Sequence, residues 1–312
     1  MPITRTVSHR VIGRSSRSAG ARQRSLPGVA PSSALARPRP FLKWAGGKGQ
    51  LLPELLARLP KQFRAYHEPF VGGGALFFEL YALGRLKAAV HLTDRNPPLI
   101  DTYETVRTDV DAVIRRLRRH RNDEAAFYRV RGQDPRRLSP AARAARVIYL
   151  NKTCYNGLYR ENRSGEFNVP FGRYVNPAIC DAENLRAVAA ALEGATLSCA
   201  PYEAVLDRAA PGDLVYFDPP YQPVSATSSF TAYHRDGFGP ADQERLRDLF
   251  ATLAGRGVHV LLSNSDTPLV RSLYGSFAID RVHASRAINS RADRRGKVAE
   301  VIVRAGTNTA SS

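Results

Sequence analysis

The stretch Leu214-Val215-Tyr216-Phe217-Asp218-Pro219-Pro220-Tyr221 is the strongest indication of the fold class of this chain. Its first four residues are apolar, which is typical of a buried strand, and the two prolines end that strand abruptly. In an open α/β sheet, ligands bind in the crevice beyond the carboxyl ends of the strands. We therefore predict a strand that delivers a carboxylate, rigid backbone carbonyls and an aromatic ring to such a crevice.

Strand and helix signals alternate around this stretch. Ala88–Leu92 and Val258–Leu262 predict strands, and Val298–Val303 alternates weakly and predicts a last strand. A helix is predicted behind Gly239-Pro240 by apolar residues at helical spacing, namely Leu246, Leu249, Phe250 and Leu253. Strand, helix and strand in this order predict an α/β fold with a doubly wound, mostly parallel, Rossmann-like sheet.

The charge of the chain favours a polyanionic partner. The 312 residues carry a formal net charge of +18, which is typical of proteins that bind nucleic acid. Residues 1–40 contain eight arginines and no acidic residue, so we predict a disordered basic leader over residues 1–39. An Arg- and Ser-rich, acid-poor segment also resembles an organelle transit peptide. Without these eight charges the remaining chain still carries +10.

The sequence predicts neither a membrane span nor a metal site. No apolar run reaches the roughly 18 residues that a transmembrane helix needs. The three cysteines, Cys154, Cys180 and Cys199, form no C-x-x-C pair. We expect them to be reduced thiols in a cytoplasmic protein without zinc.

The middle of the chain differs in character from both ends. It is rich in arginine, at positions Arg115, Arg116, Arg118, Arg119, Arg121, Arg129, Arg131, Arg136, Arg137 and Arg143. Asn151–Tyr174 then becomes aromatic and polar, with three glycines. We predict that residues 105–192 form an inserted, mainly helical domain. The catalytic domain is then discontinuous, with residues 40–104 and 193–306.

The residues after the central strand suit chemistry on an amine attached to a flat ring. The lone pair of such an amine is delocalised into the ring, so the amine is a weak nucleophile. The Asp218 carboxylate and the Pro219 carbonyl can accept its hydrogens and localise the lone pair, while Pro220 keeps the turn rigid and Tyr221 stacks on the ring. A strand followed by a Pro-Pro turn with a capping aspartate is the purely structural alternative.

Two upstream segments predict a cofactor site. Lys43–Lys48 places a glycine pair before a helix expected from about Gln50 to Arg58, which favours an anionic group, but the spacing is not that of a phosphate-binding P-loop. Trp44 either fills the core or covers a ligand. Glu68–Phe78 predicts a strand, a glycine turn and an apolar helix, and Asp94 follows 22 residues after Gly72. Together they favour a cofactor that contains a nucleoside, although the turn alone can be structural.

These segments resemble the Dam-like family of DNA adenine N6 methyltransferases, in the family's order, from Phe41 to about Val303. The stretches Arg160–Tyr174 and Phe230–Phe238 are particularly similar to that family. The resemblance implies a methyltransferase sheet and S-adenosylmethionine as cofactor. It assigns cofactor binding to Trp44, Lys48, Phe70, Gly72, Gly74, Asp94 and Asp218.

The resemblance also implies double-stranded DNA as the substrate, with the target adenine turned out of the helix and stacked on Tyr221. Phe167–Tyr174 resembles the family's recognition hairpin. Arginines of residues 107–146 and 286–297 are expected on phosphates. The DNA-binding residues expected from the recognition segment are Arg160, Asn162, Asn168, Pro170, Arg173 and Tyr174.

Several alternatives stay open at this point. Any aromatic exocyclic amine suits Asp218–Tyr221, so an RNA or cytosine N4 methyltransferase is the second hypothesis, and a DNA-binding protein with an inactive scaffold is the third. Matches in the hairpin favour GATC as the recognition sequence. The resemblance implies a monomer associated with the nucleoid through DNA. A stand-alone regulatory enzyme and the partner of a cognate restriction endonuclease both fit.

Overall fold

The computed structural model describes residues 36–44, 47–162, 164–223, 238–285 and 297–306, which belong to one compact unit, residues 31–312. The strands are β1 (Tyr66–Glu68), β2 (Val90–Asp94), β3 (Ala195–Cys199), β4 (Leu214–Phe217), β5 (His259–Ser265), β6 (Ala278–Ser285) and β7 (Lys297–Ala305). The α-helices are α1 (Leu52–Ala57), α2 (Ala75–Ala82), α3 (Pro97–Leu117), α4 (Glu124–Arg131), α5 (Pro140–Thr153), α6 (Ala182–Leu192), α7 (Pro240–Gly255) and α8 (Pro268–Leu273). The short 3₁₀ helices are η1 (Pro135–Arg137), η2 (Tyr155–Gly157) and η3 (Tyr202–Asp207).

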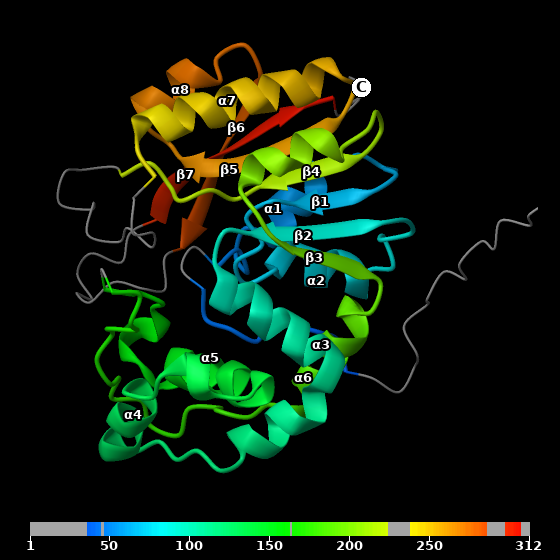
Figure 1. Ribbon diagram of the computed structural model, residues 1–312. Helices are drawn as coiled ribbons and strands as arrows, with labels where there is room; N and C mark the ends of the chain where they lie inside the picture. Colours follow the sequence, from blue (N-terminus) through cyan, green and yellow to red (C-terminus); the bar gives the residue numbers. More distant parts are fainter. Residues whose placement is uncertain (1–35, 45–46, 163, 224–237, 286–296, 307–312) are drawn as a thin grey trace, which may run out of the picture. The chain divides into compact units, whose positions relative to one another are not determined.

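The strands form one seven-stranded sheet in the order β3-β2-β1-β4-β5-β7-β6 (Figure 1). β1 to β5 are parallel to one another, whereas β7 is antiparallel to both β5 and β6. The predicted α/β fold with a mostly parallel sheet is confirmed. The strand expected at 214–217 is β4, and it lies at the centre of the sheet.

Both faces of the sheet are covered, and β4 shows why its sequence is continuously apolar. Leu214 and Tyr216 belong to a core that also contains residues of α1, α2, α3, α5 and α6. Val215 and Phe217 point to a second core with residues of η3, α7 and α8. A strand buried on both faces reads as an apolar run rather than as an alternation. The doubly wound prediction is confirmed by this arrangement.

Local signals place the helices that cover the sheet. The Asn96 side chain accepts a hydrogen bond from the Leu99 N–H at 2.9 Å and caps the start of α3, where two prolines follow. α7 begins at Pro240 and buries the four apolar residues whose spacing predicted it. Element bounds shift by a few residues from expectation: the helix predicted at 50–58 is α1, and the strand predicted at 88–92 is β2.

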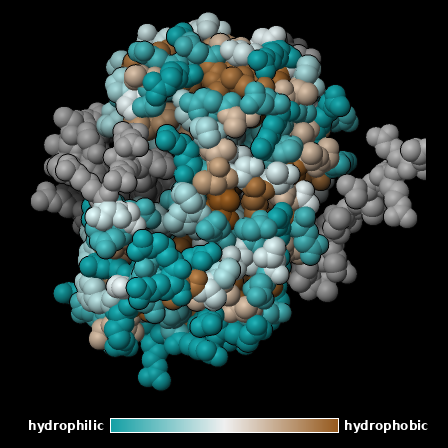
Figure 2. Space-filling model, viewed as in Figure 1, coloured by the Kyte–Doolittle hydropathy of each residue, from teal (hydrophilic) through white to brown (hydrophobic). Residues whose placement is uncertain are grey.

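The segment between β2 and β3 contains α3 to α6, which include most of the residues predicted as an insertion. α3 is kinked at Asp109 (φ −149°, ψ 54°) and packs against α5, α6 and β3. In the view of Figure 2 the surface over this segment is mostly hydrophilic. Arg115, Arg116 and Arg119 are exposed there.

The order of the strands locates the crevice. β2 and β3 lie on one side of β1, and β4 and β5 lie on the other. Successive strands are therefore added on one side of β1 up to β3 and on the other side from β4 onward. The carboxyl ends of the parallel strands β1 and β4 flank this switch point, at which α/β sheets bind ligands. β1 ends at Glu68 and β4 ends at Phe217. The glycine turn and the Asp218–Tyr221 segment consequently begin next to each other.

Candidate active site

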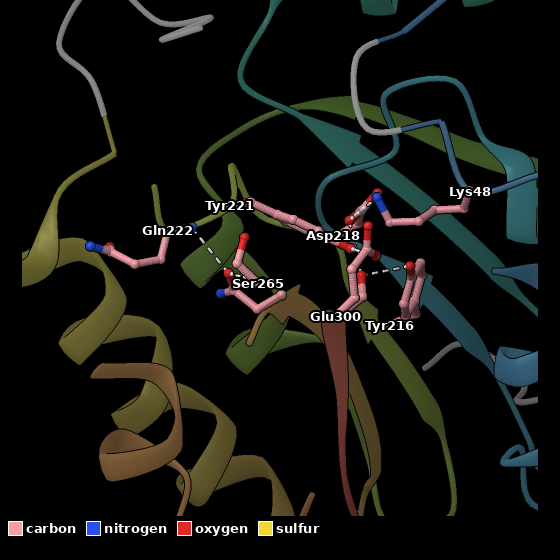
Figure 3. A network of polar contacts seen from close by, with 9 residues as sticks. Lys48, Tyr216, Asp218, Tyr221, Gln222, Ser265 and Glu300 are labelled. Atoms are coloured by element: carbon pink, nitrogen blue, oxygen red, sulfur yellow. Dashed lines mark hydrogen bonds and ion pairs between the residues drawn. The ribbon is translucent and has the colours of Figure 1, made fainter. Parts of the chain in front are cut away.

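Asp218 is held by partners from two distant parts of the chain (Figure 3). Its Oδ1 lies 2.8 Å from Lys48 Nζ and accepts a hydrogen bond from Ser263 Oγ at 3.0 Å. Ser263 in turn lies 2.9 Å from the hydroxyl of Tyr216. Burial raises the pKa of the Asp218 carboxyl above its ordinary value, and the Lys48 ammonium opposes that shift. Lys48 and Ser263 thus orient the Asp218 side chain.

Tyr221 lies beside the same lysine. Lys48 Nζ is 4.5 Å from the centroid of the Tyr221 ring, which is a cation–π distance. The Tyr221 hydroxyl donates a hydrogen bond to Glu300 Oε2 at 2.9 Å, and Glu300 is a buried residue of β7. Pro219 is buried between Asp218 and Tyr221. The four predicted catalytic residues therefore form one rigid corner at the end of β4.

The glycine turn lies at the end of β1. Gly72 (φ +46°) and Gly74 (φ +67°) adopt left-handed conformations, which disfavour residues with a side chain. The Gly72 N–H donates to Asp94 Oδ2 at 3.1 Å, so the turn is tied to the end of β2. A Cβ on Gly72 would lie 2.7 Å from Cδ1 of Trp44. Trp44 thus covers the turn while stacking on Tyr159, with ring centroids 5.3 Å apart.

Two further residues of this region differ in their surroundings. Phe70 stacks on Tyr202 with ring centroids 5.1 Å apart and packs against the second core. Glu68 is buried beneath the corner, and its carboxylate accepts a hydrogen bond from the Tyr66 hydroxyl at 2.8 Å. Burial, followed by the nearby Asp218 carboxylate among the raising causes, lifts the pKa of Glu68 to about 8. The site therefore contains more buried carboxyl groups than Asp218 alone.

Comparison with known proteins identifies the family. The sequence model of the D12 class N6 adenine-specific DNA methyltransferases matches residues 44–288. The chain belongs to this family. The type II methyltransferase M1.LlaDCHI of Lactococcus lactis subsp. cremoris is 41% identical over 273 residues, which are 85% of this chain and 94% of that protein. The DNA adenine methylase of Serratia marcescens is 41% identical over 269 residues, which are 85% and 97% of the two chains.

Membership in the D12 class confirms the resemblance that the motifs indicated. The enzyme is an adenine-specific DNA methyltransferase that acts at the N6 amine. This finding favours the first hypothesis over an RNA or a cytosine N4 methyltransferase. The DNA adenine methylase of Escherichia coli strain K12 is 38% identical over 268 residues, which are 85% of this chain and 94% of that protein.

The recognition segment of this D12 methyltransferase folds back on itself slightly earlier than predicted. The chain turns at Asn162–Gly165, where the Asn162 side chain accepts from the N–H groups of Ser164 and Glu166. Arg160 and Asn168 face each other across the hairpin, with Nε donating to Oδ1 at 2.8 Å. Phe167 pairs with Glu161 on the returning arm, and the antiparallel pairing continues to Cys154 and Phe171. The predicted segment Phe167–Tyr174 therefore contains the returning arm, and the turn precedes it.

The last predicted DNA-binding residues, Pro170, Arg173 and Tyr174, differ in their surroundings. The exposed Pro170 accepts a backbone hydrogen bond from Tyr155, and Arg173 is exposed. The Tyr174 ring lies 3.8 Å from Lys43 Nζ. Lys43 directly precedes Trp44, so the segment that covers the glycine turn also contacts the recognition segment. Lys43 was not singled out from the sequence.

Some of the arginines expected on phosphates have structural roles instead. Arg146 is buried, and its guanidinium donates to the carbonyls of Val130 and Arg131 at 3.0 and 2.7 Å, where it caps the end of α4. Arg131 donates to the Val169 carbonyl, and Arg107 donates to Glu104 and to the Ala195 carbonyl. Sequence alone did not separate these from exposed arginines such as Arg116, because all share a helical, arginine-rich context.

Several expectations lie outside the described residues. They concern the leader up to residue 35, Ala45 and Gly46 of the Lys43–Lys48 block, most of Phe230–Phe238, and the arginines of 286–296. Within the described ranges, no cluster of three His, Cys, Asp or Glu side chains could hold a metal ion. No helix in those ranges is long and apolar enough to cross a membrane.

Four site residues were missed in the sequence. Ser263 and Asn264 directly follow the strand predicted at Val258–Leu262 and were given no role, and Glu300 was included only as part of the last strand. Gln243 lies among charged residues of α7 and carried no signal. These side chains bond the Asp218–Tyr221 corner or Gln222 directly after it from positions 23 to 79 residues away, so only the folded sheet brings them together.

Proposed function

We propose that this enzyme transfers a methyl group from S-adenosylmethionine to adenine N6 at the corner formed by Asp218, Pro219, Pro220 and Tyr221. The observation that carries the proposal is the position of the Asp218 carboxylate. It lies at the β1–β4 switch point and is oriented by Lys48 and Ser263. A carboxylate with fixed partners needs no reorganisation when charge develops on the substrate.

The residues around the glycine turn fit the cofactor. At Gly72 the absence of a side chain lets the Trp44 ring lie directly against the turn, and a glycine backbone can approach a ligand closely. Asp94 accepts hydrogen bonds from the N–H groups of Gly72 and Asn96, which hold its carboxylate at the end of β2, where an acidic residue is placed to bind ribose hydroxyls. Trp44, Lys48, Phe70, Gly72, Gly74, Asp94 and Asp218 would surround the cofactor. S-adenosylmethionine supplies a methyl carbon made electrophilic by its sulfonium.

The residues of this chain prepare the amine. The Asp218 carboxylate and the Pro219 carbonyl accept the two N6 hydrogens and draw the nitrogen towards tetrahedral geometry. Tyr221 stacks on the adenine ring and restricts its orientation, so that the lone pair points in one direction. The base must leave the duplex to present its amine in this way, at a cost of a few kcal/mol.

The recognition segment supplies the proposed contacts with double-stranded DNA. Arg160, Asn162, Asn168, Pro170, Arg173 and Tyr174 would approach base edges and the sugar–phosphate backbone, and exposed arginines of α3 and η1 would contact phosphates. The hairpin residues favour GATC as the target. We further propose a monomer that associates with the nucleoid through DNA, either alone or beside a cognate restriction endonuclease.

Transfer from labelled S-adenosylmethionine to unmodified DNA, followed by digestion to nucleosides, tests this proposal. We expect labelled N6-methyladenine from the wild-type protein. Asp218→Ala should lower the transfer rate by at least about 100-fold, because a preorganised polar group of the reaction is lost. Asp111→Ala, which removes an exposed carboxylate on α3, is the matched control. Wild-type activity in Asp218→Ala would disprove the assigned role.

A further inference from the structure

Two buried amide side chains lie behind the Asp218–Tyr221 corner. Gln243 belongs to the first turn of α7 and Asn264 to the end of β5, and both are fully inaccessible to solvent. Asn264 Nδ2 donates to Gln243 Oε1 at 3.0 Å. A buried amide is costly unless its polar atoms are all paired. The hydrogen-bond partners of the two amides therefore decide the orientation of both side chains.

The backbone on either side of Tyr221 provides the remaining partners. Gln243 Nε2 donates to the Pro220 carbonyl at 3.2 Å. The Gln222 N–H donates to Asn264 Oδ1 at 3.0 Å, which is the bond drawn at Gln222 in Figure 3. The carbonyl before Tyr221 and the N–H after it are thus held by the same two side chains. With the Tyr221 hydroxyl on Glu300, the tyrosine is fixed at three points.

Donors and acceptors alternate around this arrangement, so its direction is determined. The Gln222 N–H requires an acceptor, which places Asn264 Oδ1 towards it and Asn264 Nδ2 towards Gln243 Oε1. Gln243 then presents its amide hydrogens to the Pro220 carbonyl. Reversing either amide would bring two acceptors or two donors together. Asn264 Oδ1 also accepts from the Ser265 N–H at 2.8 Å, which supports the same direction.

We propose that Gln243 and Asn264 are positioning residues that aim the Pro219 carbonyl and the Tyr221 ring at the target amine. This proposal rests on the proposed function of Asp218–Tyr221. Because Gln243 occupies the Pro220 carbonyl, the peptide plane between Pro220 and Tyr221 is anchored, and the role of amine acceptor falls to Asp218 and Pro219. Neither amide reaches the substrate, so their effect on methyl transfer passes through the turn.

Gln243→Glu tests the proposal, because it keeps the size of the side chain and removes the donor to Pro220. Once the pH is high enough to ionise the introduced carboxyl, position 243 faces the Pro220 carbonyl with an acceptor, and the turn shifts. We expect the single-turnover rate on a duplex that the wild-type protein methylates to fall by about 100-fold, as a displacement of about 1 Å does. The affinity for S-adenosylmethionine in calorimetry should stay at its wild-type value.

A pH series adds a readout that a merely structural role would not move in the same way. Lowering the pH protonates the introduced carboxyl, which can then donate to Pro220. The rate of the variant relative to wild type should therefore rise as the pH falls. Asn264→Asp removes the donor to Gln243 and should also lower the single-turnover rate. This variant provides the test if Gln243→Glu does not fold.

Asn184→Asp is the matched control. Asn184 is also a buried amide. Its oxygen accepts from the Arg39 N–H and its nitrogen donates to the Arg39 carbonyl, and no hydrogen bond links it to the Pro220–Gln222 backbone within the described residues. A Gln243→Glu rate equal to that of the control would overturn the proposal, and so would a parallel loss of cofactor affinity and melting temperature. Asp218→Ala is assayed alongside: if it stays active, the proposed function fails instead of the positioning role.

Discussion

At Gly72 the absence of a side chain serves both the backbone and the cofactor site. The residue has φ +46° and lies directly beneath the Trp44 ring. Gly84 also has a left-handed conformation, φ +64°, but no atom lies within 4 Å of the place where its Cβ would be. The two glycines therefore separate the effect of conformation from the effect of contact.

We predict that Gly72→Ala weakens S-adenosylmethionine binding by about tenfold or more, because strain of roughly 1–3 kcal/mol is relieved by displacing Trp44 or the turn. Gly84→Ala should lower the melting temperature through its conformation and leave the affinity unchanged. Calorimetry with S-adenosylmethionine and thermal unfolding of both variants provide the measurements. Equal affinity in the two variants would show that Trp44 and Gly72 do not border the cofactor.

At the scale of single elements, the helices between β2 and β3 use arginine in two ways. Arg146 is buried in α5 and caps the end of α4, where its guanidinium donates to two backbone carbonyls. Arg116 is exposed on α3, and within the described residues it has no carboxylate within ion-pair distance. The first stabilises the fold, and the second is available to a phosphate.

We predict opposite consequences for the two arginines. Arg146→Leu should lower the free energy of unfolding by about 2–3 kcal/mol, since hydrogen bonds from a charged group are lost and the carbonyls stay buried. Arg116→Leu should leave stability unchanged and reduce the slope of log affinity for DNA against log salt by about 1. Denaturant titrations and DNA binding at several salt concentrations measure both. An unchanged slope for Arg116→Leu would place this face of α3 away from DNA.

The elements themselves were largely predictable, because their signals are local. The apolar run of β4, the spacing of Leu246 and Leu253 in α7 and the glycine turn before α2 each depend on neighbours along the chain. The predicted hairpin segment, Phe167–Tyr174, contains the returning arm but not the turn, since the turn depends on how the Asn162 side chain folds onto Ser164 and Glu166. Contacts such as Tyr221 with Glu300 depend on strand order and leave no trace in a local pattern.

At the scale of the whole molecule, the buried carboxyl groups couple stability to pH. The folded protein keeps a proton on Glu68 up to about pH 8, whereas the unfolded chain loses it near the ordinary value of 4.5. Between these values the folded state binds more protons than the unfolded state, so stability falls as pH rises. Burial raises the pKa of Asp218 in the same direction.

Glu68→Gln should remove the contribution of Glu68 to the pH dependence of stability. We predict that the stability of this variant relative to wild type increases as the pH rises from about 5 to about 8, because the cost of ionising a buried acid is absent. Urea unfolding across this range measures the difference. Glu244→Gln, at an exposed position on α7, should give a curve parallel to that of wild type. Parallel curves for both variants would contradict the buried, protonated state of Glu68.

The last strand along the described chain, β7, enters the sheet between β5 and β6, and Glu300 lies on it opposite Ser265. A growing polypeptide leaves the ribosome from its amino end, so the recognition hairpin and Asp218 emerge well before this strand. A ribosome-bound chain lacking β7 has no Glu300 to accept from the Tyr221 hydroxyl and leaves the edge of β5 open. The Asp218–Tyr221 corner is therefore completed only after every other strand of the sheet has been synthesised.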